Sequence, residues 1–122
     1  MFEISVTGEF VATHRLRCPD GGFEPPHEHR WRVTATYAGP ALDEMGVLLD
    51  FGRARSHLTE VLRTLEGRDL NALPMFASRN PSAEAVACAV AERLPREIAA
   101  AAQLRCVAVE EEPGCVARYF AP

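Results

Sequence analysis

The chain contains no lysine, and its 13 basic residues, all arginine, are scattered without forming a basic run. They are outnumbered by 17 acidic residues, which gives a formal net charge of −4 and argues against nucleic acid as the main partner. Its apolar stretches are far too short to span a bilayer, so we expect no membrane partner. No secretion signal precedes the first amphipathic stretch, and we therefore expect a cytoplasmic protein.

Cysteine is sparse, and its spacing shows no pairing. The four cysteines, Cys18, Cys88, Cys106 and Cys115, never occur as Cys-x-x-Cys. Without an export signal, this pattern indicates reduced thiols rather than a disulfide framework. The length of 122 residues, with 48% hydrophobic and 25% charged residues, predicts one globular domain over residues 1–122 with a moderate core.

Two stretches near the N-terminus alternate apolar and polar residues, and this period of two predicts β-strands over residues 2–16 and 29–38. His14 ends the first strand, whereas His27 and His29 open the second. All three lie on the side of their strand that also carries the apolar residues. The intervening loop is rich in proline and glycine, so we expect the strands to pair antiparallel. The three imidazoles would then meet at one end of the pair.

Three neutral imidazoles around one point are the ligands that zinc takes in catalytic sites, with a fourth position left for water or substrate. We therefore expect His14, His27 and His29 to bind Zn²⁺. The alternative is that these histidines are hydrogen-bonded residues of the core.

Two helices are predicted in the middle of the chain. The first begins after Asp50, a predicted N-cap, and carries apolar residues at helical spacing as far as Leu65. The second begins with Asn80 as the cap and Pro81 at its first position. Its end stays open between Pro95 and Ala102, and the alanine run at 99–102 is interpreted as a helix end or a linker.

Two more strands are predicted over residues 104–112 and 115–120, with a turn at Pro113-Gly114. The element order ββααββ predicts an α+β fold in which a four-stranded antiparallel sheet carries two helices on one face. Because two helices cover only one face of such a sheet, we expect subunits to associate over the other.

Six segments resemble the 6-pyruvoyltetrahydropterin synthase family, which includes the bacterial 6-carboxytetrahydropterin synthases. They are residues 10–16 (FVATHRL), 27–29 (HEH), 46–51 (GVLLDF), 70–71 (LN), 80–84 (NPSAE) and the Glu111…Tyr119 ending. The resemblance implies the tunnelling fold, with trimers whose sheets form a barrel, two trimers stacked as a hexamer, and active sites between subunits. It also implies that zinc held by His14, His27 and His29 orients the side chain of a dihydropterin.

Glu111 shares the parity of Val107 and Val109, so its carboxylate points where apolar groups point and needs hydrogen-bond donors. The 2-amino group and ring N–H of a pterin offer two such donors, and the resemblance implies that Glu111 anchors this ring. The alternative is a solvated acidic strand end formed by Glu110, Glu111 and Glu112.

The chain departs from the family pattern in the loop before His27. The position of the family's nucleophile-like cysteine falls on Phe23, and Cys18 lies five residues earlier. One subgroup of the family carries a glutamate in a Glu-Pro-x-His context, which Glu24 resembles. We therefore expect Glu24 as the catalytic acid or base and Cys18 as a weaker candidate. The alternative for Glu24 is a solvated loop acid.

Two further departures bear on activity. The family's Asp-His pair falls on Glu66 and Gly67, and Glu28 stands where the family has glycine. Loss of the histidine should abolish or change the standard reaction. We expect a divergent lyase that acts on a dihydropterin side chain, by zinc-assisted proton abstraction or retro-aldol cleavage. The alternatives are a non-catalytic pterin-binding or assembly protein and an enzyme for a different heterocycle.

Overall fold

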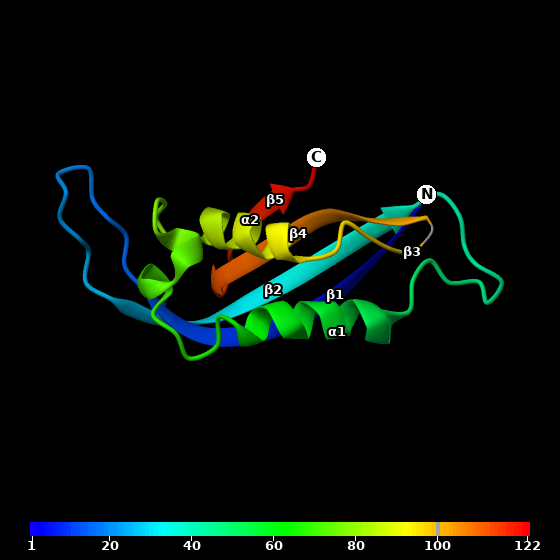
Figure 1. Cartoon of the computed structure of the whole chain (residues 1–122), viewed down its shortest axis with the longest axis horizontal. Helices are drawn as coiled ribbons and strands as arrows, with labels where there is room; N and C mark the ends of the chain where they lie inside the picture. Colours follow the sequence, from blue (N-terminus) through cyan, green and yellow to red (C-terminus); the bar gives the residue numbers. More distant parts are fainter. Residues whose placement is uncertain (100) are drawn as a thin grey trace.

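The computed structural model describes residues 1–99 and 101–122 of the chain (Figure 1). Its strands are β1 (Phe2–His14), β2 (His27–Gly39), β3 (Glu97–Ala99), β4 (Ala102–Glu112) and β5 (Cys115–Phe120). Its helices are α1 (Phe51–Arg63), α2 (Ala83–Arg93) and two short 3₁₀ helices, η1 (Leu70–Ala72) and η2 (Pro74–Phe76). The predicted α+β order is confirmed, and β3 is a short strand added to it.

One antiparallel sheet contains every strand of the described residues. Its order is β1-β2-β4-β3, and β5 also pairs with β4. The long β1–β2 ladder runs without interruption from the Phe2↔Gly39 pair to the His14↔His27 pair. This register sets the end of β1 against the start of β2, at the end of the sheet away from the N-terminus (Figure 1).

Both helices begin at a polar cap. Asp50 accepts a hydrogen bond from the backbone N–H of Arg53 and starts α1 as predicted. The cap of α2 is Ser82, which accepts from Ala85, so the predicted cap at Asn80 is wrong. Asn80 does not cap because its side chain binds the backbone of Arg17 instead.

The end of α2 is the earlier of the two that the sequence left open. The helix stops at Arg93, and the chain then forms β3. Proline at position 95 favours this end because the residue before a proline avoids the helical region. Within the alanine run at 99–102, Ala99 ends β3 and Ala102 begins β4, whereas position 100 lies outside the described residues.

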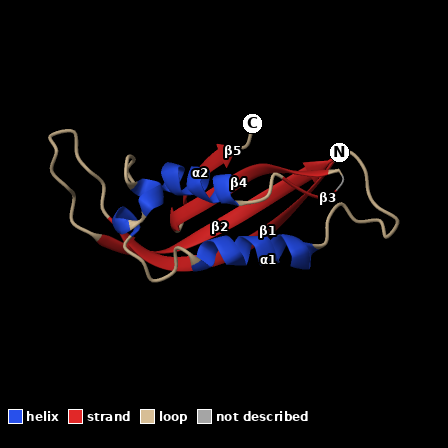
Figure 2. Ribbon diagram, in the orientation of Figure 1, coloured by secondary structure: helices blue, strands red, loops and turns tan. Residues whose placement is uncertain are grey.

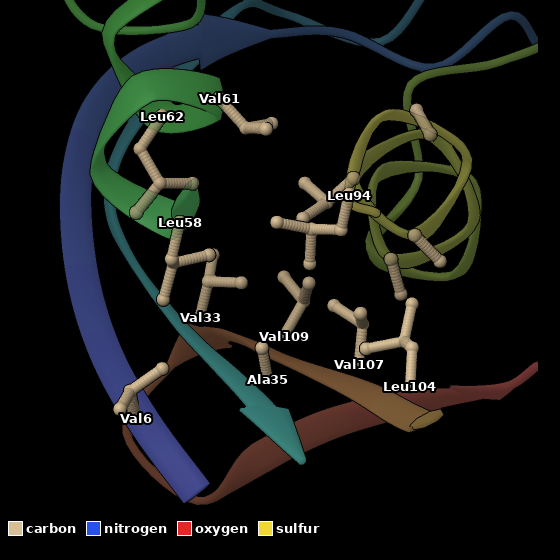
Figure 3. Close-up of a cluster of buried hydrophobic side chains, with 14 of the residues drawn as sticks. Val6, Val33, Ala35, Leu58, Val61, Leu62, Leu94, Leu104, Val107 and Val109 are labelled. Atoms are coloured by element: carbon tan, nitrogen blue, oxygen red, sulfur yellow. The ribbon is translucent and has the colours of Figure 1, made fainter. Parts of the chain in front are cut away.

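The core lies between one face of the sheet and the two helices (Figures 2 and 3). Residues of the predicted apolar parity point from the strands toward α1 and α2. They include Val33, Val107 and Val109, which are fully buried. Leu58 and Leu62 of α1 meet them at helical spacing. None of the described helices combines the length and apolar character needed to cross a membrane.

The other face of the sheet mixes polar and apolar side chains, and Val116 and Phe120 of β5 are exposed on it. Hydroxyl pairs cross from β1 to β2, with Ser5 Oγ 2.8 Å from Thr36 Oγ1 and Thr7 Oγ1 3.0 Å from Thr34 Oγ1. The exposed Val116 and Phe120 leave apolar surface on this face, so the association of subunits over it stays a prediction. The outer edge of β5 is a second candidate for association, because an unpaired strand edge can pair with another chain.

Candidate functional site

The structure brings His14, His27 and His29 together at the shared end of β1 and β2. His14 pairs with His27 across the ladder, and His29 lies opposite Ala12. The ring centroids are 5.1 Å apart for His14 and His29, 5.8 Å for His27 and His29, and 5.9 Å for His14 and His27. The antiparallel register and the shared parity therefore produce the predicted cluster.

Trp31 forms the floor of the cluster. Its ring meets those of His14 and His29 edge to face at centroid distances of 4.8 and 5.6 Å, and Phe10 stacks on it at 5.7 Å. Its indole N–H donates to the carbonyl oxygen of Ala12. Because Trp31 is fully buried, the imidazoles rest on rigid aromatic surface.

Glu111 joins the imidazoles from β4. The β4–β5 pairing shifts register between Glu110 and Glu112, so Glu111 has no direct partner on β5. Its Oε1 lies 3.2 Å from Nε2 of His14. The alternation along β4 predicted that the carboxylate points to the apolar face, but it could not predict the contact with His14, because β1 and β4 are distant in the sequence and are not neighbours in the sheet.

His14, His29 and Glu111 each offer a ligand atom, and these atoms lie within 4.8 Å of one another. His14 is buried, and its Nδ1 lies 2.8 Å from the carbonyl oxygen of Pro81. Since a carbonyl can only accept, Nδ1 carries the proton, and in the neutral ring Nε2 presents a lone pair to Glu111. Two acceptors 3.2 Å apart require a cation or a proton between them, so these residues fit a metal ion.

His27, the third predicted ligand, does not belong to this group of close ligand atoms; it lies at the edge of the cluster and contacts the loop acid Glu24. Nε2 of His27 is 3.4 Å from Oε1 of Glu24. The same oxygen accepts the backbone N–H of Leu16, and the N–H of Glu24 donates to the Leu16 carbonyl oxygen. These bonds hold Glu24 beside the imidazoles, although one third of its side chain stays exposed.

Cys18, the weaker catalytic candidate, lies in the turn of the same loop. Its N–H donates to the Gly22 carbonyl oxygen, and its own carbonyl oxygen accepts from Gly21. It lines a cavity beside Arg15 and Arg17, and it is not among the clustered ligand atoms. All four cysteines are free, as expected from their spacing.

Glu66 and Gly67, the positions on which the resemblance places the family's Asp-His pair, bind the edge of β1. The Glu66 carboxylate accepts the N–H of Val11 at 2.5 Å, and the N–H of Gly67 donates to the Val11 carbonyl oxygen at 2.7 Å. Gly67 has a φ of 71°, which favours glycine over histidine. This segment therefore supports the strand that carries His14.

Two asparagines, Asn71 and the predicted helix cap Asn80, hold the segment after His14. Asn71 accepts the N–H of Arg15 and donates to its carbonyl oxygen, and Asn80 does the same for Arg17. Each side chain replaces a missing strand partner. The Leu-Asn and Asn-Pro pairs were visible in the sequence. Their role could not be predicted, because a contact between a side chain and a distant backbone segment leaves no periodic pattern in the sequence.

A family model described as 6-pyruvoyl tetrahydropterin synthase matches residues 3–122. The chain belongs to this family. Its fold is also that of 6-pyruvoyl tetrahydropterin synthase from Caenorhabditis elegans, with a TM-score of 0.85, 20% identity, and 99% of this chain and 96% of that one covered. No curated protein sequence matches the chain.

The family fold recurs in 6-pyruvoyl tetrahydropterin synthase from Plasmodium vivax, with a TM-score of 0.81, 17% identity, and coverage of 98% and 97%. A variant of that Plasmodium protein, in which a catalytic glutamate is replaced by alanine, matches with a TM-score of 0.80, 16% identity and the same coverage. At these identities, the likeness to solved structures concerns the fold.

Proposed function

We propose that the chain is a zinc-dependent lyase that acts on the side chain of a dihydropterin. The family supplies the class of reaction, and one observation carries the proposal for this chain. Glu24, an acid that can exchange protons, stands 3.4 Å from His27 at the edge of the imidazole cluster. An acid or base beside a metal-ligand set is the arrangement that proton transfer on a coordinated side chain requires.

His14, His27 and His29 would hold the zinc. Bound zinc supplies Lewis-acid polarisation of a side-chain oxygen. The hydrogen bond from His14 Nδ1 to Pro81 orients the ring and keeps its Nε2 free to act as a ligand. Trp31 keeps the imidazoles from turning, since both His14 and His29 meet its ring edge to face.

Glu24 would take a proton from the substrate side chain and return it to the product. Its carboxylate is fixed by the Leu16 N–H and is still partly open to a ligand. The catalytic glutamate of the Plasmodium protein supports the use of a carboxylate in this fold. Cys18 lies in the turn of the loop and would serve only if that turn moved.

Glu111 would anchor the pterin ring through two donors on one carboxylate. Its contact with His14 allows a second role as a metal ligand. The Glu111→Gln variant separates the two roles, because loss of an anchor lowers pterin affinity whereas loss of a ligand lowers zinc content.

A pterin-binding protein without catalysis is the second candidate. It is favoured by Glu66, whose carboxylate is occupied by the Val11 N–H, and by Gly67, which offers no side chain for proton transfer. Such a protein would keep the zinc and the ring anchor and would leave the side chain of the ligand intact.

The test is turnover of dihydroneopterin triphosphate by the zinc-supplemented protein, followed by mass spectrometry. We expect a product of side-chain cleavage or of triphosphate elimination. Glu24→Gln should lower turnover by about two to four orders of magnitude without loss of ligand binding, which is the usual range for an acid–base group. Glu28→Gln, on the exposed neighbour of His27, is the matched control. Binding without conversion by the unaltered protein would establish the second candidate instead.

A further inference from the structure

Two carboxamide side chains complete one edge of the segment that follows His14. The backbone N–H of Arg15 donates to Oδ1 of Asn71 at 2.9 Å, and Nδ2 of Asn71 donates to the Arg15 carbonyl oxygen at 2.8 Å. Asn80 makes the same pair of bonds with Arg17, at 2.7 and 3.2 Å. Asn71 and Asn80 are the only two asparagines in the chain, and we call this pair the amide clamp.

A carboxamide fits this position because it carries an acceptor and a donor on two separate atoms, as a peptide unit does. A carboxylate can only accept, and a hydroxyl has both functions on one atom. Each asparagine therefore bonds the N–H and the C=O of one residue, as a partner residue in an antiparallel ladder does. Just before His14, the same edge is held by backbone, since the N–H of Thr13 donates to the Arg68 carbonyl oxygen at 3.0 Å. The amide clamp continues this edge beyond the end of β1.

The opposite edge of the clamped segment holds a proposed metal ligand and the proposed acid. The backbone polar groups of an extended chain alternate between its two edges, so residues 14 and 16 face away from the amide clamp. His14 pairs there with His27. The N–H of Leu16 donates to Oε1 of Glu24, and the N–H of Glu24 donates to the Leu16 carbonyl oxygen, both at 3.0 Å. The backbone of Leu16 therefore sets where the Glu24 carboxylate lies.

Asn80 is linked to His14 by a second route. The next residue, Pro81, is buried, and its carbonyl oxygen lies 2.8 Å from Nδ1 of His14. The proline ring locks one of the backbone torsions between the Asn80 peptide and this carbonyl, so the positions of the two groups are coupled. The hydrogen bond to Pro81 selects the tautomer of His14 in which Nε2 is free for a metal ion.

We propose that Asn71 and Asn80 are positioning residues of the imidazole site. Asn80 sets the ring of His14 through Pro81, and both asparagines set Glu24 through the backbone of residues 15–17. The ligand and the acid thus depend on one clamped segment. Groups that are already ordered lose less conformational freedom when a metal ion or a substrate binds, so the amide clamp raises the affinity of the site. The inference rests on the proposed function only for the roles of His14 and Glu24.

The first test is the tautomer of His14 in the zinc-free protein, read from the NMR shifts of its ring nitrogens at mildly alkaline pH, where imidazole is neutral. The unaltered protein should carry the proton on Nδ1, and Asn80→Ala should populate both tautomers. Zinc affinity, measured by competition with a chelator, should fall about tenfold in Asn80→Ala, the lower end of the range for an outer-shell partner.

Two further variants separate positioning from stability. Asn80→Asp keeps the acceptor for the Arg17 N–H and loses only the donor, so it should fold and weaken zinc binding less than Asn80→Ala does. Val6→Ala removes packing from the core of β1 and should lower stability without a change in tautomer or zinc affinity. An unaltered tautomer and unaltered zinc affinity in both Asn80 variants would overturn the role of Asn80.

The second test is hydrogen exchange of the Leu16 backbone N–H, again in the zinc-free protein. Asn71→Ala should speed this exchange by at least about tenfold, because local opening of the clamped segment becomes easier while the core stays closed. Val6→Ala should instead speed the slowest amides of the core. Exchange at Leu16 that is unaltered in Asn71→Ala would overturn the role of Asn71. The tautomer and the exchange rate need neither zinc nor turnover, so failure of the lyase proposal is seen separately.

Discussion

The two faces of the sheet are made by the same strands and differ in what each can do. On one face, Phe10, Ala12 and His14 follow one another along β1, so the apolar core continues directly into the imidazole cluster. On the other face, hydroxyls and charges meet water, as at the Thr7–Thr34 pair.

This difference shows how the site is built. Side chains alternate along a strand, so the residues on one side form a row. Ligands at the end of the apolar row of β1 and β2 are held rigidly, because their neighbours in that row are packed in the core. Trp31 belongs to both the core and the imidazole cluster, since it packs against Phe10 and contacts His14. Neighbouring residues on the same strand therefore offer matched tests, one on each face.

The largest expected effect is at Trp31. Trp31→Ala should lower the free energy of unfolding by about 3–5 kcal/mol, the usual range for a large aromatic side chain removed from a core. Arg32→Ala, one residue along β2 on the exposed face, should change it by less than about 0.5 kcal/mol. Denaturant unfolding of both variants measures the contrast, and equal losses would show that the faces are not distinct.

The next effect is on metal binding. His29→Ala removes one ligand of the compact group and should weaken zinc binding by at least about 100-fold, more than the loss of an outer-shell partner. Arg30→Ala changes the next residue, which faces solvent, and should leave zinc affinity unaltered. Competition with a chromophoric chelator gives both values. An unaltered affinity in His29→Ala would remove this histidine from the site.

A smaller loss is expected for the pterin. Glu111→Gln keeps the shape of the side chain but replaces one acceptor oxygen and the charge, so pterin affinity should fall about tenfold. Glu112→Gln, on the exposed neighbour, is the control. Fluorescence titration with a pterin measures both, and equal affinities would exclude Glu111 as the anchor.

The smallest effect concerns the far end of the apolar row, at Tyr37. Of the described residues, this is the one whose side chain has a buried polar atom with no hydrogen-bond partner. Tyr37→Phe should therefore raise the free energy of unfolding by about 1 kcal/mol, since a buried hydroxyl without a partner is unfavourable.

Tyr37 also predicts a dependence on pH. Burial raises the pKa of Tyr37 from 10.0 to about 12. Between these values, the unfolded chain loses the phenolic proton and the folded chain keeps it, so stability should fall as the pH rises from 10 toward 12. Unfolding curves over this range should show a smaller fall for Tyr37→Phe. Identical pH profiles would contradict the buried, unpaired hydroxyl.

Much of this architecture could be predicted because it has a period. Alternation along β1 and β2 gave the two strands, their faces and the meeting of the three imidazoles. Helical spacing after Asp50 gave α1. In a regular helix or strand, the position of a residue along the chain decides which side of the element it faces, so the apolar pattern reveals the buried side.

The remaining features depend on contacts between distant segments, which leave no local pattern. Ser82 caps α2, because the side chain of Asn80 is hydrogen-bonded to the backbone of Arg17. The carboxylate of Glu66 accepts the N–H of Val11. The contact of Glu111 with His14 joins β4 to β1, two strands that are not neighbours in the sheet. None of these contacts follows from spacing along the chain alone.

We infer that the apolar row of β1 and β2 ends in a metal site. It is tested most directly by the zinc content of the unaltered protein, purified without chelator and measured by inductively coupled plasma mass spectrometry before and after zinc is added. We predict about one zinc per chain, as a set of three histidines with an open position would hold. A protein that is free of metal and remains so when zinc is added would exclude a zinc site formed by these histidines.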